Sequence, residues 1–337
     1  MATAFAPATA VTMGDPAGIG IEITLKAWAQ REDTGLGAFF LIADADTVRG
    51  EAASIGFDAP VASIENPDAA PAAFTDALPV LHQPLPGSIN AGTPNPAHAP
   101  AILGAIETAT TLTTEGRTDA LVTNPIHKET LIQAGFRFSG HTDYLGHLAG
   151  GVSSVMMLVS QDLRVVPATV HTGLREAIDS LTPDLLVECG KTTAQSLRED
   201  FGISSPRIVM AGLNPHAGEG GVFGFEEKLI IGPAIERLRA EGITVRGPFA
   251  ADTLFHDAAR ATYDAAICMY HDQALIPIKT LDFAHAVNTT LGLPFVRTSP
   301  DHGTALDIAG TNRADPSSLI EAIRLAQKMA HNRRRPA

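Results

Sequence analysis

The sequence has little cysteine and little positive charge. Its two cysteines, Cys189 and Cys268, are far apart and show no paired spacing, which argues against a disulfide framework and fits a reducing compartment. With 24 Lys and Arg against 37 Asp and Glu, the net charge is −13. Nucleic acid and anionic membrane surfaces need clustered cations, so both are disfavoured as partners. A phosphorylated ligand would need a local basic pocket.

The sequence also lacks the segments that mark several common protein classes. We find no signal peptide and no apolar run of membrane-spanning length, which predicts a cytoplasmic protein. The glycine-rich stretch Gly14–Gly20 matches neither the Rossmann fingerprint nor the phosphate-binding loop of nucleotide triphosphatases, and no Gly-x-Ser-x-Gly elbow occurs. A nucleotide triphosphatase and a serine hydrolase are therefore disfavoured.

Short apolar runs alternate with helical patterns along the chain. The runs lack polar alternation, as in strands that are covered on both faces. Candidate strands are Ala10–Met13, Phe39–Ala43, Ala120–Thr123, Ser154–Val159, Arg164–His171, Arg207–Leu213 and Ala265–Met269. Candidate helices are Ile19–Gln30, Pro100–Thr113, residues 183–200 after an N-cap at Thr182, and residues 315–331. The alternation predicts an α/β sandwich with a largely parallel sheet, and Pro60–Pro100 is expected to be loop with short edge strands.

Three histidines follow candidate strands. His171 ends one strand, His216 lies in a glycine-rich segment after the next, and His271 follows the strand at 265–269. Ligands bind at the carboxyl ends of parallel strands, so three imidazoles there could hold one divalent metal ion with open positions for a substrate. The separations of 45 and 55 residues form no compact metal motif, and ordinary loop histidines are the alternative.

Other polar residues suggest an anion site. The pair His141-Thr142 could offer imidazole and hydroxyl groups to an anion, and it also suits a helix N-terminus, where anions bind. Lys128 follows a candidate strand and could neutralise phosphate, or be a surface lysine. Arg297 lies in an apolar segment, where we expect an anionic partner from the substrate or from the protein. The glycine-punctuated loop Asp301–Gly310 could wrap an adenosine or be only a turn.

Taken together, these segments resemble the 4-hydroxythreonine-4-phosphate dehydrogenase family. The matching stretches are Met13–Glu22, Gly140–Thr142, Gly212–Gly221, Met269–Leu281, Asn288–Gly310 and Asp315–Leu319. The resemblance implies the two-lobed α/β/α fold of isocitrate and isopropylmalate dehydrogenases, which lack a Rossmann fingerprint. It also implies a discontinuous cofactor-side lobe, residues 1–130 plus 285–337, and a lobe for the metal and the dimer interface, residues 131–284.

The resemblance also implies the site residues. The metal, which would be zinc, magnesium, manganese or cobalt, would bind to His171, His216 and His271. Substrate contacts would fall on His141, Thr142, Lys279, Asn288 and Arg297. The NAD-binding loop would include His302, Gly303 and Asp307. The implied assembly is a homodimer, with His271 supplied by the partner subunit.

The implied reaction is the NAD-dependent oxidation of 4-phosphooxy-threonine, a small phosphorylated hydroxy-amino acid, in pyridoxal phosphate biosynthesis. The 3-oxo acid would then decarboxylate to 3-amino-2-oxopropyl phosphate. Lys279 and Asp252 are the candidate general bases. Alternatives are a related dehydrogenase acting on a four-carbon sugar-acid phosphate or a cis-dihydrodiol, a metal-dependent hydrolase or lyase, and a non-catalytic phosphate-binding protein.

Overall fold

The computed structural model describes residues 7–334, and the chain divides into two units. The first unit runs to Val152 and resumes at Leu293–His331, and the second comprises Ser153–Gly292 with the residues from Asn332 onward. These bounds differ from those drawn from the sequence. The reason is that helices α6 (Lys128–Gln133) and α7 (His141–Leu148) pack on elements of the first unit, near residues 96–114.

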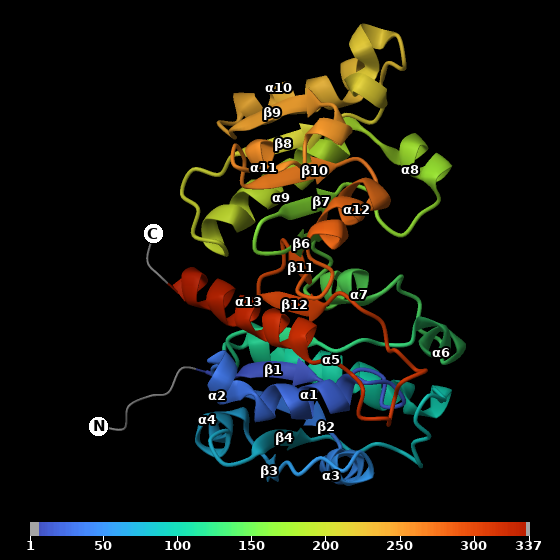
Figure 1. Cartoon of the computed structure of the whole chain (residues 1–337), viewed down its shortest axis with the longest axis vertical. Helices are drawn as coiled ribbons and strands as arrows, with labels where there is room; N and C mark the ends of the chain where they lie inside the picture. Colours follow the sequence, from blue (N-terminus) through green and yellow to red (C-terminus); the bar gives the residue numbers. More distant parts are fainter. Residues whose placement is uncertain (1–6, 335–337) are drawn as a thin grey trace. The chain divides into compact units, whose positions relative to one another are not determined.

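The strands of the first unit follow one another in the order β3-β4-β2-β1-β5-β12 (Figure 1). Each neighbouring pair is parallel. The strands are β1 (Thr9–Thr12), β2 (Phe39–Ala43), β3 (Val61–Ile64), β4 (Leu78–His82), β5 (Leu121–Thr123) and β12 (Arg297–Pro300). All five residues of β2 are buried, as expected for a parallel strand that is covered on both faces.

Helices connect these strands, and further short helical turns lie at Pro67–Ala69 and Pro96–His98. The helices are α1 (Gly20–Ala29), α2 (Arg31–Thr34), α3 (Ala45–Ser54), α4 (Ala70–Ala73), α5 (Ala99–Thr114), α6, α7 and α13 (Ser317–Arg334). Helix α5 contacts β1, β2 and β5. Within residues 7–334, no helix is both long and apolar enough to cross a membrane.

The second unit has the strand order β11-β6-β7-β10-β8-β9. Strand β6 is antiparallel to both β11 and β7, whereas β7, β10, β8 and β9 are parallel. The elements are β6 (Val155–Val159), β7 (Arg164–Pro167), α8 (Leu174–Ser180), α9 (Pro183–Glu199), β8 (Ile208–Ala211), η3 (Pro215–Gly221), η4 (Glu227–Ile231), α10 (Gly232–Ala240), β9 (Val245–Phe249), η5 (Ala251–Thr253), α11 (Asp257–Arg260), β10 (Ala265–Cys268), α12 (His271–Leu281) and β11 (Val287–Leu291). The parallel strands therefore end at one edge, where the three histidine segments begin.

The predicted α/β architecture with a largely parallel sheet is confirmed. The stretch Pro60–Pro100 contains more than loop, because β4 lies inside the strand order of the first unit and only β3 is at its edge. Strand β7 ends at Pro167, so His171 lies in the loop four residues beyond the strand and not at its last position.

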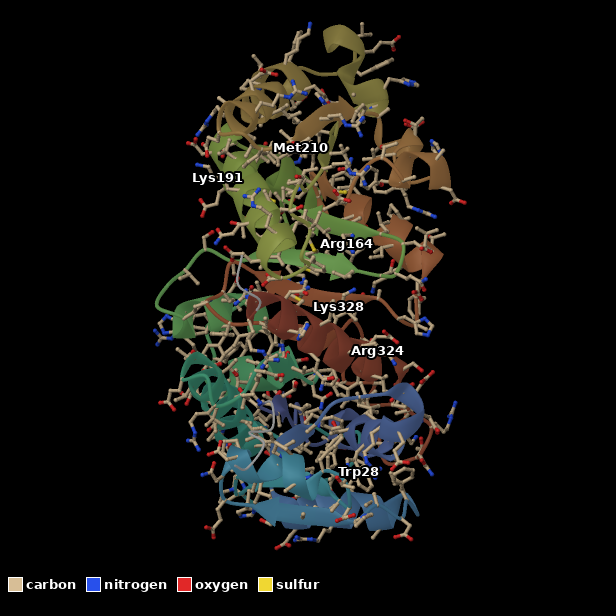
Figure 2. All side chains as sticks on the ribbon, turned by 90° about the vertical axis from the view of Figure 1, so that its left-hand side faces the viewer. Trp28, Arg164, Lys191, Met210, Arg324 and Lys328 are labelled. Atoms are coloured by element: carbon tan, nitrogen blue, oxygen red, sulfur yellow. The ribbon has the colours of Figure 1, made fainter. Side chains whose placement is uncertain are left out.

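Trp28 on α1 shows how the first unit packs (Figure 2). The indole is buried, and its Nε1 atom donates a hydrogen bond to the backbone carbonyl of Phe74 (2.9 Å). The Arg31 guanidinium lies 4.1 Å from the centre of the ring, a cation–π contact. One aromatic side chain thus joins α1 to the end of α4.

Replacing Thr182 with alanine is expected to destabilise the second unit by about 1 kcal/mol. The Thr182 hydroxyl accepts a hydrogen bond from the backbone N–H of Leu185 (3.1 Å) and caps α9. Thr182→Ser keeps the acceptor and should stay near the wild type. Urea unfolding of the three proteins checks this, and equal midpoints for Thr182→Ala and the wild type would contradict it.

Candidate functional site

Arg297, the first residue of β12, belongs to a cluster of basic side chains in the first unit, with His141 and Lys128. The residue is only 2% exposed, and its Nη2 atom donates to the hydroxyl of Thr123 at the end of β5 (2.6 Å). The two side chains meet because β5 and β12 pair in parallel, with Arg297 opposite Leu121. Burial lowers the pKa of Arg297 to about 9. An anion bound beside the Arg297 guanidinium would stabilise this desolvated cation.

His141 contributes an imidazole to the same basic cluster. It is the first residue of α7, and its buried Nε2 atom has no hydrogen-bond partner among the described residues. Burial lowers the pKa of His141 well below its usual range, and the charges of Arg297 and Lys128 lower it further. The ring is therefore neutral near pH 7 and can donate one hydrogen bond to an anion. Thr142 follows it, half-buried in the first turn of α7.

Lys128 lies beside Gly140, the residue that precedes His141. A Cβ atom at Gly140 would be 3.1 Å from Cε and 3.2 Å from Nζ of Lys128, so the ammonium group lies against the N-terminus of α7. Helix N-termini favour negative charge. Donor groups from α6, α7 and β12 thus converge at one place, and such a group suits a phosphate.

The structure brings two of the three predicted metal ligands together in the second unit. The ring centres of His171 and His271 are 6.0 Å apart. Nδ1 of His271 contacts the Asp272 carboxylate (2.7 Å), a contact that can orient the ring. The two imidazoles line a cavity of about 220 Å³, together with Thr169, Leu174, Tyr270 and Asp272.

His216 is not grouped with this pair in the single chain. The His216 imidazole lies beside the Phe223 ring, with the ring centres 6.0 Å apart. No cluster of three or more potential metal-binding side chains occurs in the part of one chain that the structure describes. His216 is exposed on η3, where it lies in a left-handed backbone conformation (φ 53°, ψ 29°).

Three further predicted residues lie in the second unit. Lys279 is half-buried on α12, and its Nζ atom is 5.6 Å from the centre of the Phe283 ring. Asn288 on β11 has a buried Oδ1 atom without a partner among residues 7–334. Asp252 is exposed on η5. Lys279 lies on α12, the helix that begins at His271, whereas Asp252 lies on the separate turn η5.

The predicted cofactor loop lies between β12 and α13 in the first unit. His302 and Gly303 are joined by a contact between Nδ1 and the backbone oxygen (2.9 Å), and Asp307 is exposed. The backbone oxygen of Thr304 accepts from Ile19 N (3.1 Å), which places this loop against the glycine-rich turn after β1. The two loops follow β1 and β12, which both pair with β5, so they could form one ligand-binding edge.

Two buried polar residues near that edge were missed from the sequence. Asp15 is 1% exposed, and burial raises its pKa, while a hydrogen bond from Ala17 N and the charges of His127 and His98 act in the opposite direction. His98 is also 1% exposed, and neither ring nitrogen has a partner within the described chain. The Gly-Asp-Pro turn gave a signal for Asp15, but nothing in the local sequence marks His98.

A cluster of basic side chains and a histidine pair beside a cavity in an α/β fold are typical of enzymes that act on small anionic metabolites. A family model for the pyridoxal phosphate biosynthetic protein PdxA matches residues 36–326, and this chain belongs to that family. The resemblance seen in the sequence is thereby confirmed.

Individual relatives agree with this assignment over nearly the whole chain. A 4-hydroxythreonine-4-phosphate dehydrogenase from Bradyrhizobium diazoefficiens is 50% identical and covers 98% of this chain and 99% of its own length. A solved structure of the enzyme of that name from Klebsiella pneumoniae is 38% identical, with a TM-score of 0.86 and coverage of 96% and 99%. A terephthalate 1,2-cis-dihydrodiol dehydrogenase from Burkholderia xenovorans is 30% identical, with a TM-score of 0.66 and coverage of 96% and 98%.

Proposed function

We propose that this protein is an NAD-dependent dehydrogenase that oxidises 4-phosphooxy-threonine in pyridoxal phosphate biosynthesis. The observation that carries the proposal is the cluster of Arg297, His141 and Lys128, because it combines a buried guanidinium, a hydrogen-bond donor and a second cation that suit a phosphate. The relative that is 50% identical bears the name of this activity. A cis-dihydrodiol has no phosphate to accept hydrogen bonds from these groups.

Arg297, His141 and Thr142, all in the first unit, would bind the phosphate of the substrate. Arg297 and His141 would donate hydrogen bonds to the phosphate, and the Thr142 hydroxyl would add a third donor at the start of α7. Burial excludes water from the guanidinium, which strengthens its attraction for the phosphate. The substrate would therefore be held by its phosphate, away from the carbon that is oxidised.

The histidine pair of the second unit fits a divalent cation in part. Asp272 engages Nδ1 of His271, which leaves Nε2 as the ligating atom. His171 is close enough to share the ion, but a catalytic zinc site has three protein ligands. When bound, a zinc, magnesium, manganese or cobalt ion supplies Lewis acidity that favours the deprotonated form of the substrate alcohol.

Proton and hydride transfer would complete the reaction. Lys279 would accept the proton of the C3 hydroxyl as the general base, while NAD accepts the hydride. Asn288 would hold the amino-acid end of the substrate through its side-chain amide. Oxidation at C3 places a ketone beta to the carboxylate, so carbon dioxide leaves and 3-amino-2-oxopropyl phosphate is the product. The loop with His302, Gly303 and Asp307 would contact the adenosine of NAD.

A homodimer would supply the third histidine. Several large apolar side chains are exposed close in sequence to the histidines, among them Val222 and Phe225 near His216, and Ile276 and Phe283 after His271. Exposed apolar groups of this kind are typical of surfaces that a partner covers. By the family's arrangement, His271 would come from the partner subunit, whereas a shared ion between His171 and His271 of one chain would leave His216 as the ligand that crosses the interface.

NADH formation from 4-phosphooxy-threonine tests the proposed function. We expect turnover with a divalent cation present and its loss when a chelator removes the ion, with recovery on adding the ion back. The unphosphorylated 4-hydroxythreonine is the matched control and should react poorly, because it has no phosphate to bind to Arg297, His141 and Lys128. A protein that oxidises a cis-dihydrodiol, or binds no NAD, would refute the proposal.

A further inference from the structure

A chain of hydrogen bonds connects the ends of the three strands that precede the histidines. The hydroxyl of Thr169, after β7, donates to the backbone oxygen of Met269, after β10 (2.8 Å). The backbone N–H of Met269 donates to Oε1 of Gln273 (2.7 Å), and Nε2 of Gln273 donates to the backbone oxygen of Gly212, after β8 (2.8 Å). The three segments that carry His171, His271 and His216 are therefore joined through polar side chains.

Gln273 is the centre of this chain. It lies on α12 two residues after His271 and is only 8% exposed. Strands β8 and β10 pair in parallel, with Ala265 opposite Ile208, so their carboxyl ends lie side by side. The Gln273 amide bridges these two ends with one acceptor and one donor. Both of its hydrogen bonds are buried, where losing a partner is costly.

The segment that carries His216 needs such support because its backbone is strained. Five successive residues, from His216 to Gly220, have positive φ values between 40° and 76°. Left-handed conformation is unfavourable for residues other than glycine because Cβ approaches the following carbonyl oxygen, and three of these five residues are not glycine. The strain must be offset by contacts elsewhere in the loop.

Glu227 provides the first of these contacts. Its carboxylate is 6% exposed and accepts from the backbone N–H groups of Leu213 (2.9 Å) and Asn214 (2.8 Å). At Gly218 a Cβ atom would lie 2.5 Å from the Glu227 carboxylate, so the turn closes directly over this side chain. Glu227 fixes the loop onto η4, and Gln273 fixes the start of the same loop to α12.

We propose that Gln273 is a positioning residue that fixes the starts of two segments, the His216 segment and helix α12, which carries His271, and through them the affinity for a divalent cation. The inference rests on the proposed function only in taking these histidines as metal ligands. Glutamine suits the position because Met269 offers a donor and Gly212 an acceptor. A glutamate would place an anionic oxygen against the Gly212 carbonyl, and a methionine would satisfy neither group.

Gln273→Met in the full chain tests the proposal. We expect Co²⁺ or Mn²⁺ to bind the variant about 10–100-fold more weakly in calorimetry, the range seen when groups that orient metal ligands are removed. The visible absorption spectrum of the Co²⁺ form should change as the coordination loosens. Binding of inorganic phosphate in the first unit should stay as in the wild type.

Gln195→Met is the matched control. Gln195 is exposed on α9, and its side-chain amide donates to Glu199 on the same helix (3.0 Å), so its replacement should leave metal binding unchanged. Because Gln273→Met removes two buried hydrogen bonds, Gln273→Glu serves as a second variant that keeps the Met269 contact and loses the Gly212 contact. It should also weaken metal binding and speed hydrogen exchange at Leu213.

Wild-type metal affinity and Co²⁺ spectrum in either folded variant would overturn the inference, as would the absence of divalent-cation binding by the wild-type protein. Metal is titrated alone, without substrate or NAD. A protein that binds metal in a Gln273-dependent way but does not oxidise 4-phosphooxy-threonine would therefore refute the proposed function and leave this inference standing.

Discussion

Arg297→Met should lower kcat/KM for 4-phosphooxy-threonine by about a hundredfold to a thousandfold, because truncating one partner of a buried charge pair costs roughly 2–5 kcal/mol. The guanidinium is buried beside Thr123, and burial has already removed its water. In the variant, the phosphate would lose its water beside Arg297 without gaining the guanidinium charge that offsets this loss. Steady-state kinetics on both the phosphorylated and the unphosphorylated substrate measure the effect.

The comparison between the two substrates separates binding from general damage. Arg297→Met should affect only the phosphorylated one, so an equal loss on both would contradict the role in phosphate binding. Arg324→Met is a matched control, because Arg324 on α13 forms an exposed ion pair with Glu321 (Figure 2). Exposed pairs contribute about 0–1 kcal/mol, so this variant should keep the wild-type rate.

His271→Ala should remove metal-dependent turnover, with a loss of about a thousandfold or more if Lewis acidity provides several kcal/mol of transition-state stabilisation. The imidazole lines the cavity that it shares with His171 and is oriented by Asp272. Metal content and NADH formation are measured on the same preparation. His256→Ala is the control, since His256 is exposed at the start of α11. Full metal content in His271→Ala would exclude His271 as a ligand.

Mixing inactive variants determines which chain supplies each histidine. If the partner subunit provides His271, a dimer of one His171→Ala chain and one His271→Ala chain retains one complete site and regains activity. If His171 and His271 serve the same site from one chain, as their 6.0 Å ring separation allows, the mixture stays inactive. The same mixing with His216→Ala would then identify the ligand that crosses the interface.

The local sequence pattern was sufficient to predict helices and strands whose positions are decided by burial and by helix capping. The apolar run Phe39–Ala43 forms β2 with those same bounds, and the Thr182 cap begins α9 as predicted. It was insufficient where tertiary contacts decide. Strands β3 and β4 lie in an Ala/Pro-rich stretch whose composition resembles loop, and they exist because their backbones pair with neighbouring strands.

The candidate site shows the same division. Residue types at strand ends pointed to His171 and His271, and a cation within an apolar segment pointed to Arg297. Only the structure shows that His141, Lys128 and Arg297 converge. Sequence spacing could not show that His216 lies apart from the other two histidines in one chain. It also gave no sign of Gln273, because its importance comes from the backbone groups of Met269 and Gly212 that it reaches.

The single tryptophan gives the first unit an optical signal of its own. Trp28 is the only residue of its type, and it is buried under Arg31 and bonded to Phe74 within that unit. Its fluorescence therefore reports the melting of the first unit alone, whereas far-ultraviolet circular dichroism follows the helices of both. Denaturation curves recorded with the two probes will coincide if the chain unfolds as one cooperative block and separate if the units unfold in sequence.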